Sequence, residues 1–235
     1  AIGGIRELDL TGSIGVIASE PHPPYNRPPL SKGLWKGAAL DSIWRAAADD
    51  NLTFHQGRTA RNLDAQGKRV TDDRGTVHEF DKLLLATGCR TRTFPFGQDE
   101  IIYFRTVDDY ERLRSAAEHC DRFAVIGGGF IGSEIAAALA MNGNKVTWIF
   151  PDEFVGSRMY PPELARSLSE LYRERGVEVI AGAKVTGCES RDGESTLTVH
   201  DSQSGADRKI VVDGVVAGIG VQPNVELAQA AGLSV

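Results

Sequence analysis

One stretch, Phe123–Asp152, constrains the fold of this 235-residue chain more than any other. It begins with the apolar run Phe123-Ala-Val-Ile126, which is typical of a strand buried on both faces. Gly127, Gly129 and Gly132 follow and complete the pattern G-x-G-x-x-G. In such a pattern the first glycine allows a tight turn, the second lets a diphosphate approach the backbone, and the third lets a helix pack closely on the strand. The stretch therefore predicts a dinucleotide site.

The residues after these glycines supply the context that a lone glycine pattern lacks. Glu134–Met141 is an alanine-rich segment with the character of a helix, and Gly143 is placed to end it. Val146–Phe150 is then expected to form a second buried strand. A helix that begins between two such strands offers free N–H groups and a partial positive charge, and both suit a diphosphate.

The composition limits the classes of function. Apolar residues make up 41% and charged residues 25% of the chain, which is ordinary for a globular protein with a real core. The net charge of −6 disfavours a broad nucleic-acid surface, and no apolar run is long enough to cross a membrane. Cys89, Cys120 and Cys188 are far apart and form no C-x-x-C pair, which argues against a zinc site and a redox-active dithiol. We therefore expect no metal site and a reducing, cytoplasmic location.

The N-terminal part of the chain contains a strand followed by an unusually stiff loop. Ser13–Ala18 is an apolar run that predicts a buried strand, and Glu20 follows its end. Pro21–Lys32 contains five prolines, which exclude regular structure. Such a loop is either a linker or a binding loop, and its place after a strand end favours binding. Asp41–Asp50 is expected to form a short helix.

Two further helices have recognisable signals. Thr106, with Asp109 three residues later, has the capping-box pattern and predicts a helix that runs to about Cys120. A second helix is expected after the proline pair at 161–162. Three leucines at helical spacing predict its apolar stripe: Leu164, Leu168 and Leu171.

The two halves of the chain follow one plan. Three segments of the first half match three of the second: Ser13–Ile17 with Lys145–Ile149, Leu52–Gly57 with Val177–Gly182, and Asp81–Gly88 with Asp213–Gly220. The last pair reads as buried strands that end in a glycine turn, and each half also contains an alternating stretch, 58–80 and 184–212, typical of an antiparallel meander. We predict an α/β protein with two tandem Rossmann-like, three-layer dinucleotide-binding domains, each carrying a small antiparallel β-meander.

The same alignment of the halves places Ala1 opposite about Ser133. The first copy would then lack the strand and glycine loop that the second copy has at 121–132. We therefore expect the chain to be truncated at its start, and at its end near Val235.

Four motifs connect the chain to a known family: Pro24-Tyr-Asn-Arg-Pro-Pro-Leu-Ser-Lys32, Leu85-Ala-Thr-Gly88, Ile126-Gly-Gly-Gly-Phe-Ile-Gly-Ser-Glu134 and Gly218-Ile-Gly-Val-Gln-Pro-Asn224. With them the chain resembles the FAD-dependent pyridine nucleotide-disulfide oxidoreductase superfamily over essentially its whole length. Within that superfamily it is most similar to the ferredoxin and rubredoxin reductases and to apoptosis-inducing factor.

The resemblance implies a cofactor for each domain. Residues 1–104 and 223–235 would form an incomplete FAD-binding domain, and residues 105–222 an inserted NAD(H)-binding domain. It also implies cofactor contacts at a defined set of positions: Glu20, Arg27, Pro28, Lys32, Ala86, Thr87, Gly88, Arg92, Gly127, Gly129, Phe130, Ile131, Gly132, Glu134, Asp152, Gly218, Ile219 and Gly220. For Arg27, Lys32 and Arg92, solvated surface charge is the alternative.

Lys32 and Glu134 are the pair to which the resemblance gives a catalytic role. In the family pattern they approach each other near the flavin N5 and the nicotinamide. A buried lysine needs a counter-charge, so the pair would hold both rings for hydride transfer. Alternatively, Glu134 is only a favourable acid in the first turn of a helix. Phe130 either stacks on the nicotinamide or is a core residue.

The choice between NADH and NADPH depends on the end of the second strand of the glycine stretch. An acid there usually binds the ribose 2′-hydroxyl, whereas NADP sites use arginine. Phe150 occupies that position here, and Asp152 follows two residues later, as an acid does in apoptosis-inducing factor. The first arginine after it is Arg158. We expect NADH, with NADPH less favoured.

The predicted activity is hydride transfer from NADH to FAD, followed by electron transfer to an external acceptor such as a small iron–sulfur protein, a quinone or oxygen. The lack of a C-x-x-C near the flavin loop excludes the dithiol relay of the disulfide reductases. The alternative is a nucleotide-binding or redox-sensing module without turnover. We expect no nucleic-acid or membrane partner, and a monomer or homodimer.

Overall fold

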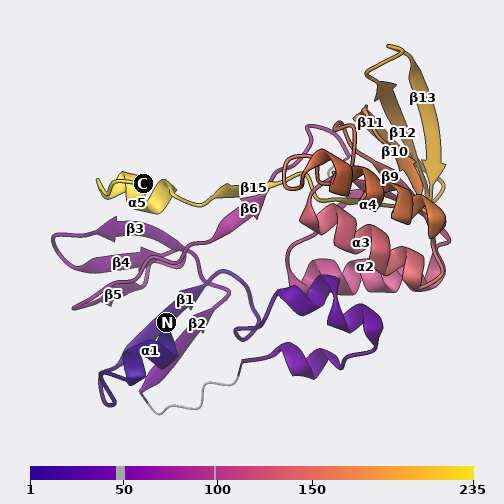
Figure 1. Ribbon diagram of the computed structural model, residues 1–235. Helices are drawn as coiled ribbons and strands as arrows, with labels where there is room; N and C mark the ends of the chain where they lie inside the picture. The colour runs from indigo at the N-terminus through magenta and orange to yellow at the C-terminus, as the bar shows by residue number, and fades with distance from the viewer. Residues whose placement is uncertain (46–50, 98) are drawn as a thin grey trace. The chain divides into compact units, whose positions relative to one another are not determined.

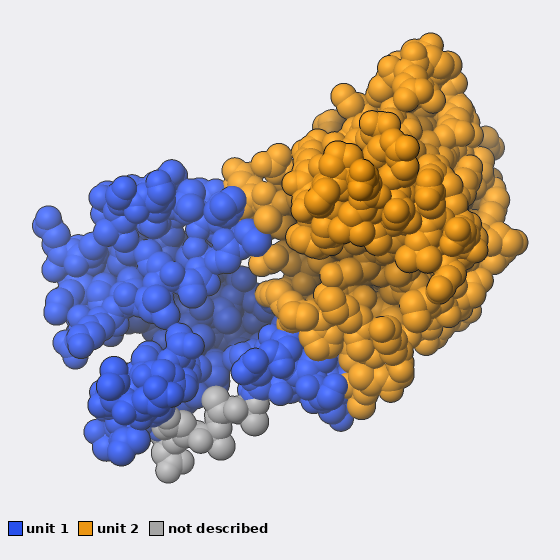
Figure 2. Space-filling model, in the orientation of Figure 1, with its two compact units in different colours: residues 1–26, 40–89, 223–235 blue, residues 27–39, 90–222 orange. Residues whose placement is uncertain are grey.

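The computed structural model describes residues 1–45, 51–97 and 99–235 (Figure 1). The chain divides into two compact units, which Figure 2 colours separately. Unit 1 comprises Ala1–Asn26, Leu40–Cys89 and Pro223–Val235, and unit 2 comprises Arg27–Ala39 and Arg90–Gln222. Each unit is built on parallel strands, so the predicted α/β class is confirmed.

Unit 2 contains a five-stranded sheet in the order β10-β9-β8-β14-β7. Its strands are β7 (Ile101–Tyr103), β8 (Arg122–Ile126), β9 (Lys145–Ile149), β10 (Glu178–Ile180) and β14 (Gly214–Ala217). All neighbouring strands run parallel. From β8 the chain proceeds to β9 on one side, and it returns at β14 on the other side. Strand order therefore reverses between β8 and β14, which is where open α/β sheets bind ligands.

Helices cover one face of this sheet and a meander covers the other (Figure 1). The helices are α2 (Val107–His119), α3 (Phe130–Met141) and α4 (Pro162–Glu174), and the antiparallel meander is β11 (Ala183–Arg191), β12 (Glu194–Asp201) and β13 (Asp207–Val212). Because side chains alternate along a strand, Ala124 and Ile126 pack with Leu197 and Val199 of the meander. Phe123 and Val125 are equally buried and face the helices. These are the three layers that the sequence predicts.

Helix α4 buries a different stripe from the one predicted. Leu164 and Leu171 are exposed, at 47% and 42%, whereas Ala165 and Ser169 are fully buried. The Ser169 hydroxyl accepts a hydrogen bond from the Val155 backbone N–H at 2.9 Å, so a small polar residue is what this contact requires. The leucine stripe predicted the helix correctly and its buried face wrongly.

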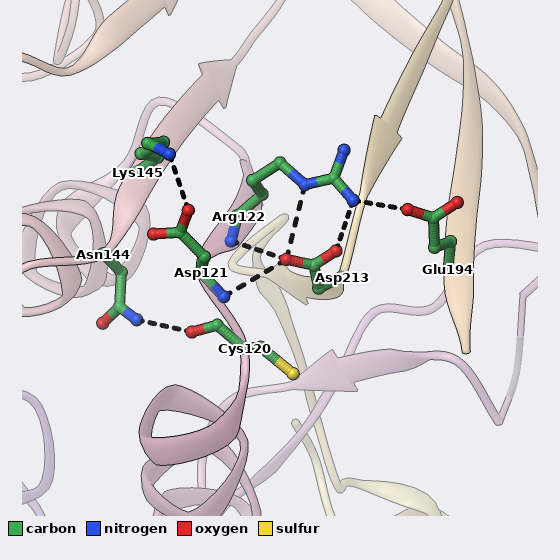
Figure 3. Close-up of polar contacts among 7 residues, drawn as sticks. All are labelled: Cys120, Asp121, Arg122, Asn144, Lys145, Glu194 and Asp213. Carbon is green, nitrogen blue, oxygen red and sulfur yellow. Dashed lines mark hydrogen bonds and ion pairs between the residues drawn. The ribbon is translucent and has the colours of Figure 1, made fainter.

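The amino-terminal ends of β8, β9 and β14 carry a polar cluster (Figure 3). The Arg122 guanidinium contacts Asp213 at 2.6 Å and Glu194 at 2.5 Å, and Lys145 pairs with Asp121 at 2.6 Å. The hydrogen bonds from Arg122 lower the pKa of the Asp213 carboxyl. These contacts join the ends of the strands at the edge opposite the glycine turn, so we assign them a structural role.

Unit 1 contains the parallel pair β1 (Ile14–Ala18) and β2 (Leu52–Gln56), and the meander β3 (Ala60–Asp64), β4 (Arg69–Asp72) and β5 (Val77–Glu79). It also contains α1 (Ile2–Arg6) and α5 (Glu226–Ala230). A 3₁₀ turn covers Leu40–Ile43, where a helix over 41–50 was expected, and residues 46–50 lie outside the described part.

The predicted buried strand Asp81–Gly88 is not observed. These residues form no regular element, and Leu83 and Leu84 are 41% and 64% exposed. Its counterpart Gly214–Ala217 is a strand because β8 and β7 pair with it on both sides. No described residue pairs with 81–88 in this way, and an apolar run without a hydrogen-bonding neighbour does not become a strand.

A short pair, β6 (Cys89–Thr91) and β15 (Val221–Pro223), forms where the chain passes between the units. None of the helices described here has the length and apolar character that crossing a bilayer requires.

Candidate functional site

The N-terminus of α3 is open in the way that the glycine pattern predicts. Gly129 is its N-cap, and within the described residues no side chain caps the helix and no acid occupies its first turn. The neighbouring helix α2 is different, because Thr106 and Asp109 form the predicted capping box and accept hydrogen bonds from its first N–H groups. The start of α3 therefore keeps N–H donors and a positive dipole end for an anion.

Three glycines bring two turns into contact at this point. A Cβ on Gly132 would overlap the carbonyl oxygen of Gly127, and a Cβ on Gly127 would overlap that of Gly218. The Gly218 N–H in turn donates to the Ile126 carbonyl at 2.8 Å. The turn after β8 and the turn after β14 thus meet at the point where strand order reverses, and only glycine allows their backbones to approach so closely.

The rest of the β14 turn continues from this junction. Ile219 packs partly buried against the core, and the Gly220 carbonyl accepts the Arg92 backbone N–H at 3.0 Å. The Arg92 side chain extends over the same turn, with Nε 3.4 Å from the Val221 carbonyl oxygen.

The Trp148 side chain holds the glycine turn in place through a hydrogen bond to its backbone. Its indole N–H donates to the Gly127 carbonyl at 2.8 Å, and the ring is fully buried. The Tyr172 ring lies 4.7 Å from it, and the Tyr172 hydroxyl donates to the Ser133 carbonyl at 2.9 Å. Burial raises the pKa of Tyr172. Sequence reasoning did not identify either aromatic residue as a support for the site.

Lys32 and Glu134, 102 positions apart by number, are an ion pair in unit 2 with Nζ and Oε2 2.8 Å apart. The buried Ser31 hydroxyl donates to the same carboxylate oxygen at 2.5 Å. Glu134 lies beyond the first turn of α3, so an interaction with the helix dipole does not account for it. The Lys32 side chain is 54% exposed, so the expected burial of this lysine is not observed.

The proline-stiffened segment is anchored beside α2 and α3. Pro28 begins the 3₁₀ turn Pro28–Ser31, and Leu30, Leu34 and Trp35 are buried. The Arg27 guanidinium donates to the Arg105 carbonyl at 3.0 Å, and the Asn142 amide donates to the Trp35 carbonyl at 3.2 Å. These contacts place Ser31 and Lys32 against α3, which is why a loop residue reaches Glu134.

Other predicted residues of unit 2 lie in the first turn of α3 and on the loop after β9. Phe130 is 57% and Ile131 37% exposed, so Phe130 is not a core residue. The Tyr160 ring approaches the Phe130 ring edge-on at 6.4 Å. Asp152, on the loop after β9, pairs with Arg158 at 3.1 Å.

Four of the predicted residues lie in unit 1: Glu20, Ala86, Thr87 and Gly88. Glu20 follows β1, and its carboxylate accepts a hydrogen bond from the Tyr25 hydroxyl. Thr87 and Asn224 exchange two hydrogen bonds, and the Gly88 carbonyl accepts the Asn224 N–H at 3.0 Å. Ala86 is exposed in the segment without regular structure.

The sequence matches a family described as pyridine nucleotide-disulphide oxidoreductase over residues 4–235. The chain belongs to this family. Its match confirms the resemblance that the four motifs indicated.

Among relatives of the family, a ferredoxin–NAD(+) reductase component of the anthranilate 1,2-dioxygenase system from Burkholderia cepacia is 36% identical, with 98% of this chain and 58% of the relative covered. A ferredoxin reductase structure from Rhodopseudomonas palustris aligns with a TM-score of 0.89 and 30% identity, over 99% of this chain and 58% of that one. A covalent putidaredoxin reductase–putidaredoxin complex aligns equally well, at 0.89 and 30%, over 100% of this chain and 58% of that one. The chain thus spans a little over half the length of these relatives.

None of the described cysteines forms a disulfide. Cys89, Cys120 and Cys188 are all free thiols. No group of three metal-binding side chains occurs within the ranges that the structure describes. Burial raises the pKa of the Cys120 and Cys188 thiols, which leaves them protonated and unreactive.

Proposed function

We propose that this protein is an FAD-dependent NAD(P)H oxidoreductase of the ferredoxin reductase type, with NADH as the preferred donor. The single observation that carries the proposal is the uncapped start of α3 between two converging glycine turns, in a chain that belongs to this family. A helix start of this kind binds a diphosphate through N–H groups and dipole. We assign NADH to residues 105–222, and FAD to residues 1–104 and 223–235.

Different residues near the start of α3 bind different parts of NADH. Gly127, Gly129 and Gly132 admit the diphosphate to the backbone, and Gly218–Gly220 form the opposing turn. Phe130 and Ile131 expose apolar surface that suits the nicotinamide. Asp152 is the acid for the adenosine ribose.

Lys32 and Glu134 carry the proposed catalytic role. A flavin, when bound, supplies hydride-accepting chemistry that no side chain of this protein has. Ser31 and Lys32 hold the Glu134 carboxylate through one oxygen, Oε2. Among the residues that the structure describes, none is bonded to Oε1, so this oxygen is available to orient a ligand. A pair fixed in this way orients reacting groups at little entropic cost.

The FAD contacts are proposed at positions that the resemblance supplies. We assign Glu20 as the acceptor for the ribose hydroxyls, and Arg27, Pro28 and Arg92 as contacts of the diphosphate and flavin. The segment Ala86–Gly88 passes beneath the cofactor.

The partner we propose is an external electron acceptor, a small iron–sulfur protein being favoured over a quinone or oxygen. The solved complex of putidaredoxin reductase with putidaredoxin supports this choice by analogy. Free cysteines support a reducing, cytoplasmic location, and the protein is proposed to act as a monomer or homodimer.

The experiment that tests the function is steady-state reduction of an artificial electron acceptor, with and without added FAD. The proposal predicts turnover with NADH that saturates with FAD and falls at least tenfold in Glu134→Gln. Binding of NADH without any turnover, at every FAD concentration, would instead favour a nucleotide-binding or redox-sensing module.

A further inference from the structure

Lys32 lies between two points at which its segment is fixed to α3. The buried Ser31 hydroxyl donates to the Glu134 carboxylate at 2.5 Å. Further along the segment, the Trp35 carbonyl accepts a hydrogen bond from the Asn142 side-chain amide at 3.2 Å. The placement of the lysine beside Glu134 therefore depends on both contacts, although Asn142 lies about 12 Å further along the helix than the glutamate.

Glu134 and Asn142 occupy one face of α3. Because residues four apart lie one above the other in an α-helix, Glu134, Ala138 and the C-cap Asn142 form a row along it. Ser31 and Trp35 meet this row in the same order, so the segment runs alongside the helix. Removing the Asn142 contact would free the end of the segment that follows the lysine.

The Asn142 amide has a fixed orientation. Its nitrogen donates to the Trp35 carbonyl and, at 2.8 Å, to the Ala138 carbonyl, while its oxygen accepts the Arg114 guanidinium at 3.0 Å. Both partners of the nitrogen are carbonyls and the partner of the oxygen is a cation, so only this orientation of the amide satisfies all three contacts. An aspartate at this position would keep the contact with Arg114 and place an oxygen against two carbonyls.

The Trp35 end of the segment is rigid. The Trp35 ring is buried, its indole N–H donates to the Leu30 carbonyl at 2.8 Å, and the Tyr110 ring meets it edge-on at 5.8 Å. The Arg114 guanidinium that holds the Asn142 oxygen also lies 5.4 Å from the centroid of the Trp35 ring. Closely packed groups of this kind transmit a displacement, so a shift at Trp35 reaches the lysine.

We propose that Asn142 is a positioning residue for hydride transfer, and that it acts through Trp35 to keep the Lys32 ammonium against the Glu134 carboxylate. This inference rests on the proposed function, because it concerns the same ion pair. The lysine needs such support, since its side chain is 54% exposed and has little packing of its own. Asn142 contacts the segment and not the pair itself. Its loss should therefore lower the rate of hydride transfer and leave NADH affinity nearly unchanged.

Stopped-flow reduction of the FAD holoenzyme by NADH is the first test. Asn142→Ala should slow flavin reduction about fivefold, which corresponds to one hydrogen bond, and leave the NADH dissociation constant within about twofold. Asn142→Asp should be slowed at least as much, because it also loses the donor to Trp35. In the Glu134→Gln background, Asn142→Ala should have no further effect, since the pair that it positions is already broken.

Asn144→Ala is the matched control. The Asn144 amide donates to the Ala117 and Cys120 carbonyls at 3.1 and 2.9 Å, and Figure 3 shows the second contact. The variant thus removes the same kind of side chain from the chain just after α3, where it binds the end of α2 and not the lysine segment. Amide hydrogen exchange gives a readout without nucleotides. The backbone amides of residues 30–37 should exchange about fivefold faster in Asn142→Ala than in the wild type or in Asn144→Ala.

The outcomes separate this inference from the proposed function. If NADH reduces the wild-type flavin and either Asn142 variant reacts at the wild-type rate, the inference alone is overturned. Equal slowing in Asn142→Ala and Asn144→Ala also overturns it, because the effect would be a general loosening of α3. An unchanged exchange rate of residues 30–37, or a full further loss in the Glu134→Gln background, has the same consequence. A wild-type holoenzyme that NADH binds and does not reduce overturns the proposed function and the inference with it.

Discussion

Replacing Gly132 by alanine should weaken the fold even though alanine is the better helix former. In an exposed helix interior the change stabilises by about 1 kcal/mol. Here the new Cβ would overlap the Gly127 carbonyl oxygen and lie 3.0 Å from its carbon. That carbonyl cannot shift freely, because it accepts the Trp148 indole N–H at 2.8 Å. Overpacking of this kind costs about 1–3 kcal/mol, and backbone-to-backbone overlap belongs at the upper end.

The net loss is therefore about 2 kcal/mol, or a fall in Tm of roughly 4–8 °C for a protein of this size. Gly129→Ala is the matched variant, since a Cβ there meets nothing within 4 Å and the backbone φ is −86°. Gly129→Ala should leave Tm within about 2 °C of the wild-type value. It should lower NADH affinity at least tenfold, because the new methyl group occupies the space through which the diphosphate approaches the backbone.

Thermal unfolding and NADH titration of both variants provide the assay. If Gly132→Ala unfolds at the wild-type temperature, the close approach of α3 to the glycine turn is not what the geometry indicates. If Gly129→Ala binds NADH as tightly as the wild type, the diphosphate does not lie at this turn.

Three other perturbations follow from the described contacts. Glu134→Gln should slow flavin reduction by NADH about 10–100-fold in stopped flow, because it removes the charge that pairs with Lys32. Glu163→Gln, at an exposed position of α4, is its control. Equal rates in the two variants would refute the catalytic role of Glu134. Trp148→Phe should cost about 1–3 kcal/mol in urea unfolding, since it leaves the Gly127 carbonyl without its partner, and an unchanged midpoint would contradict that. Burial alone would raise the pKa of Asp72, but hydrogen bonds from Thr76, His78, Arg74 and Arg58 outweigh burial and lower it. The stability that this carboxylate provides is then complete above its unfolded pKa of about 3.9 and is lost as pH falls further. Acid unfolding of Asp72→Asn should depend less steeply on pH than the wild type, and identical slopes would refute this.

The glycine turn was predictable because its signals are local. A strand, three glycines and a helix follow one another within a short stretch. β8 and β9 form close to the predicted bounds, and α3 begins at Phe130, earlier than the predicted Glu134. The capping box of α2 is local in the same sense. The absence of a strand at Asp81–Gly88 was not predictable, because a buried strand depends on neighbours that no short stretch specifies.

The candidate site was predictable only in part for the same reason. Ser31 and Glu134 are 103 positions apart, and nothing near either residue signals their hydrogen bond. The motif resemblance supplied Lys32 but not Ser31. Arg158 was visible in the sequence only as the first arginine after Asp152, and nothing near either residue signals the ion pair between them.

The most direct test of the central claim is the visible absorption spectrum of the purified protein, recorded before and after one equivalent of NADH without oxygen. We expect flavin bands, release of FAD on acid treatment, and loss of the oxidised flavin band on addition of NADH. A flavin spectrum that NADH leaves unchanged, in a protein that binds NADH, would contradict hydride transfer between the two cofactors.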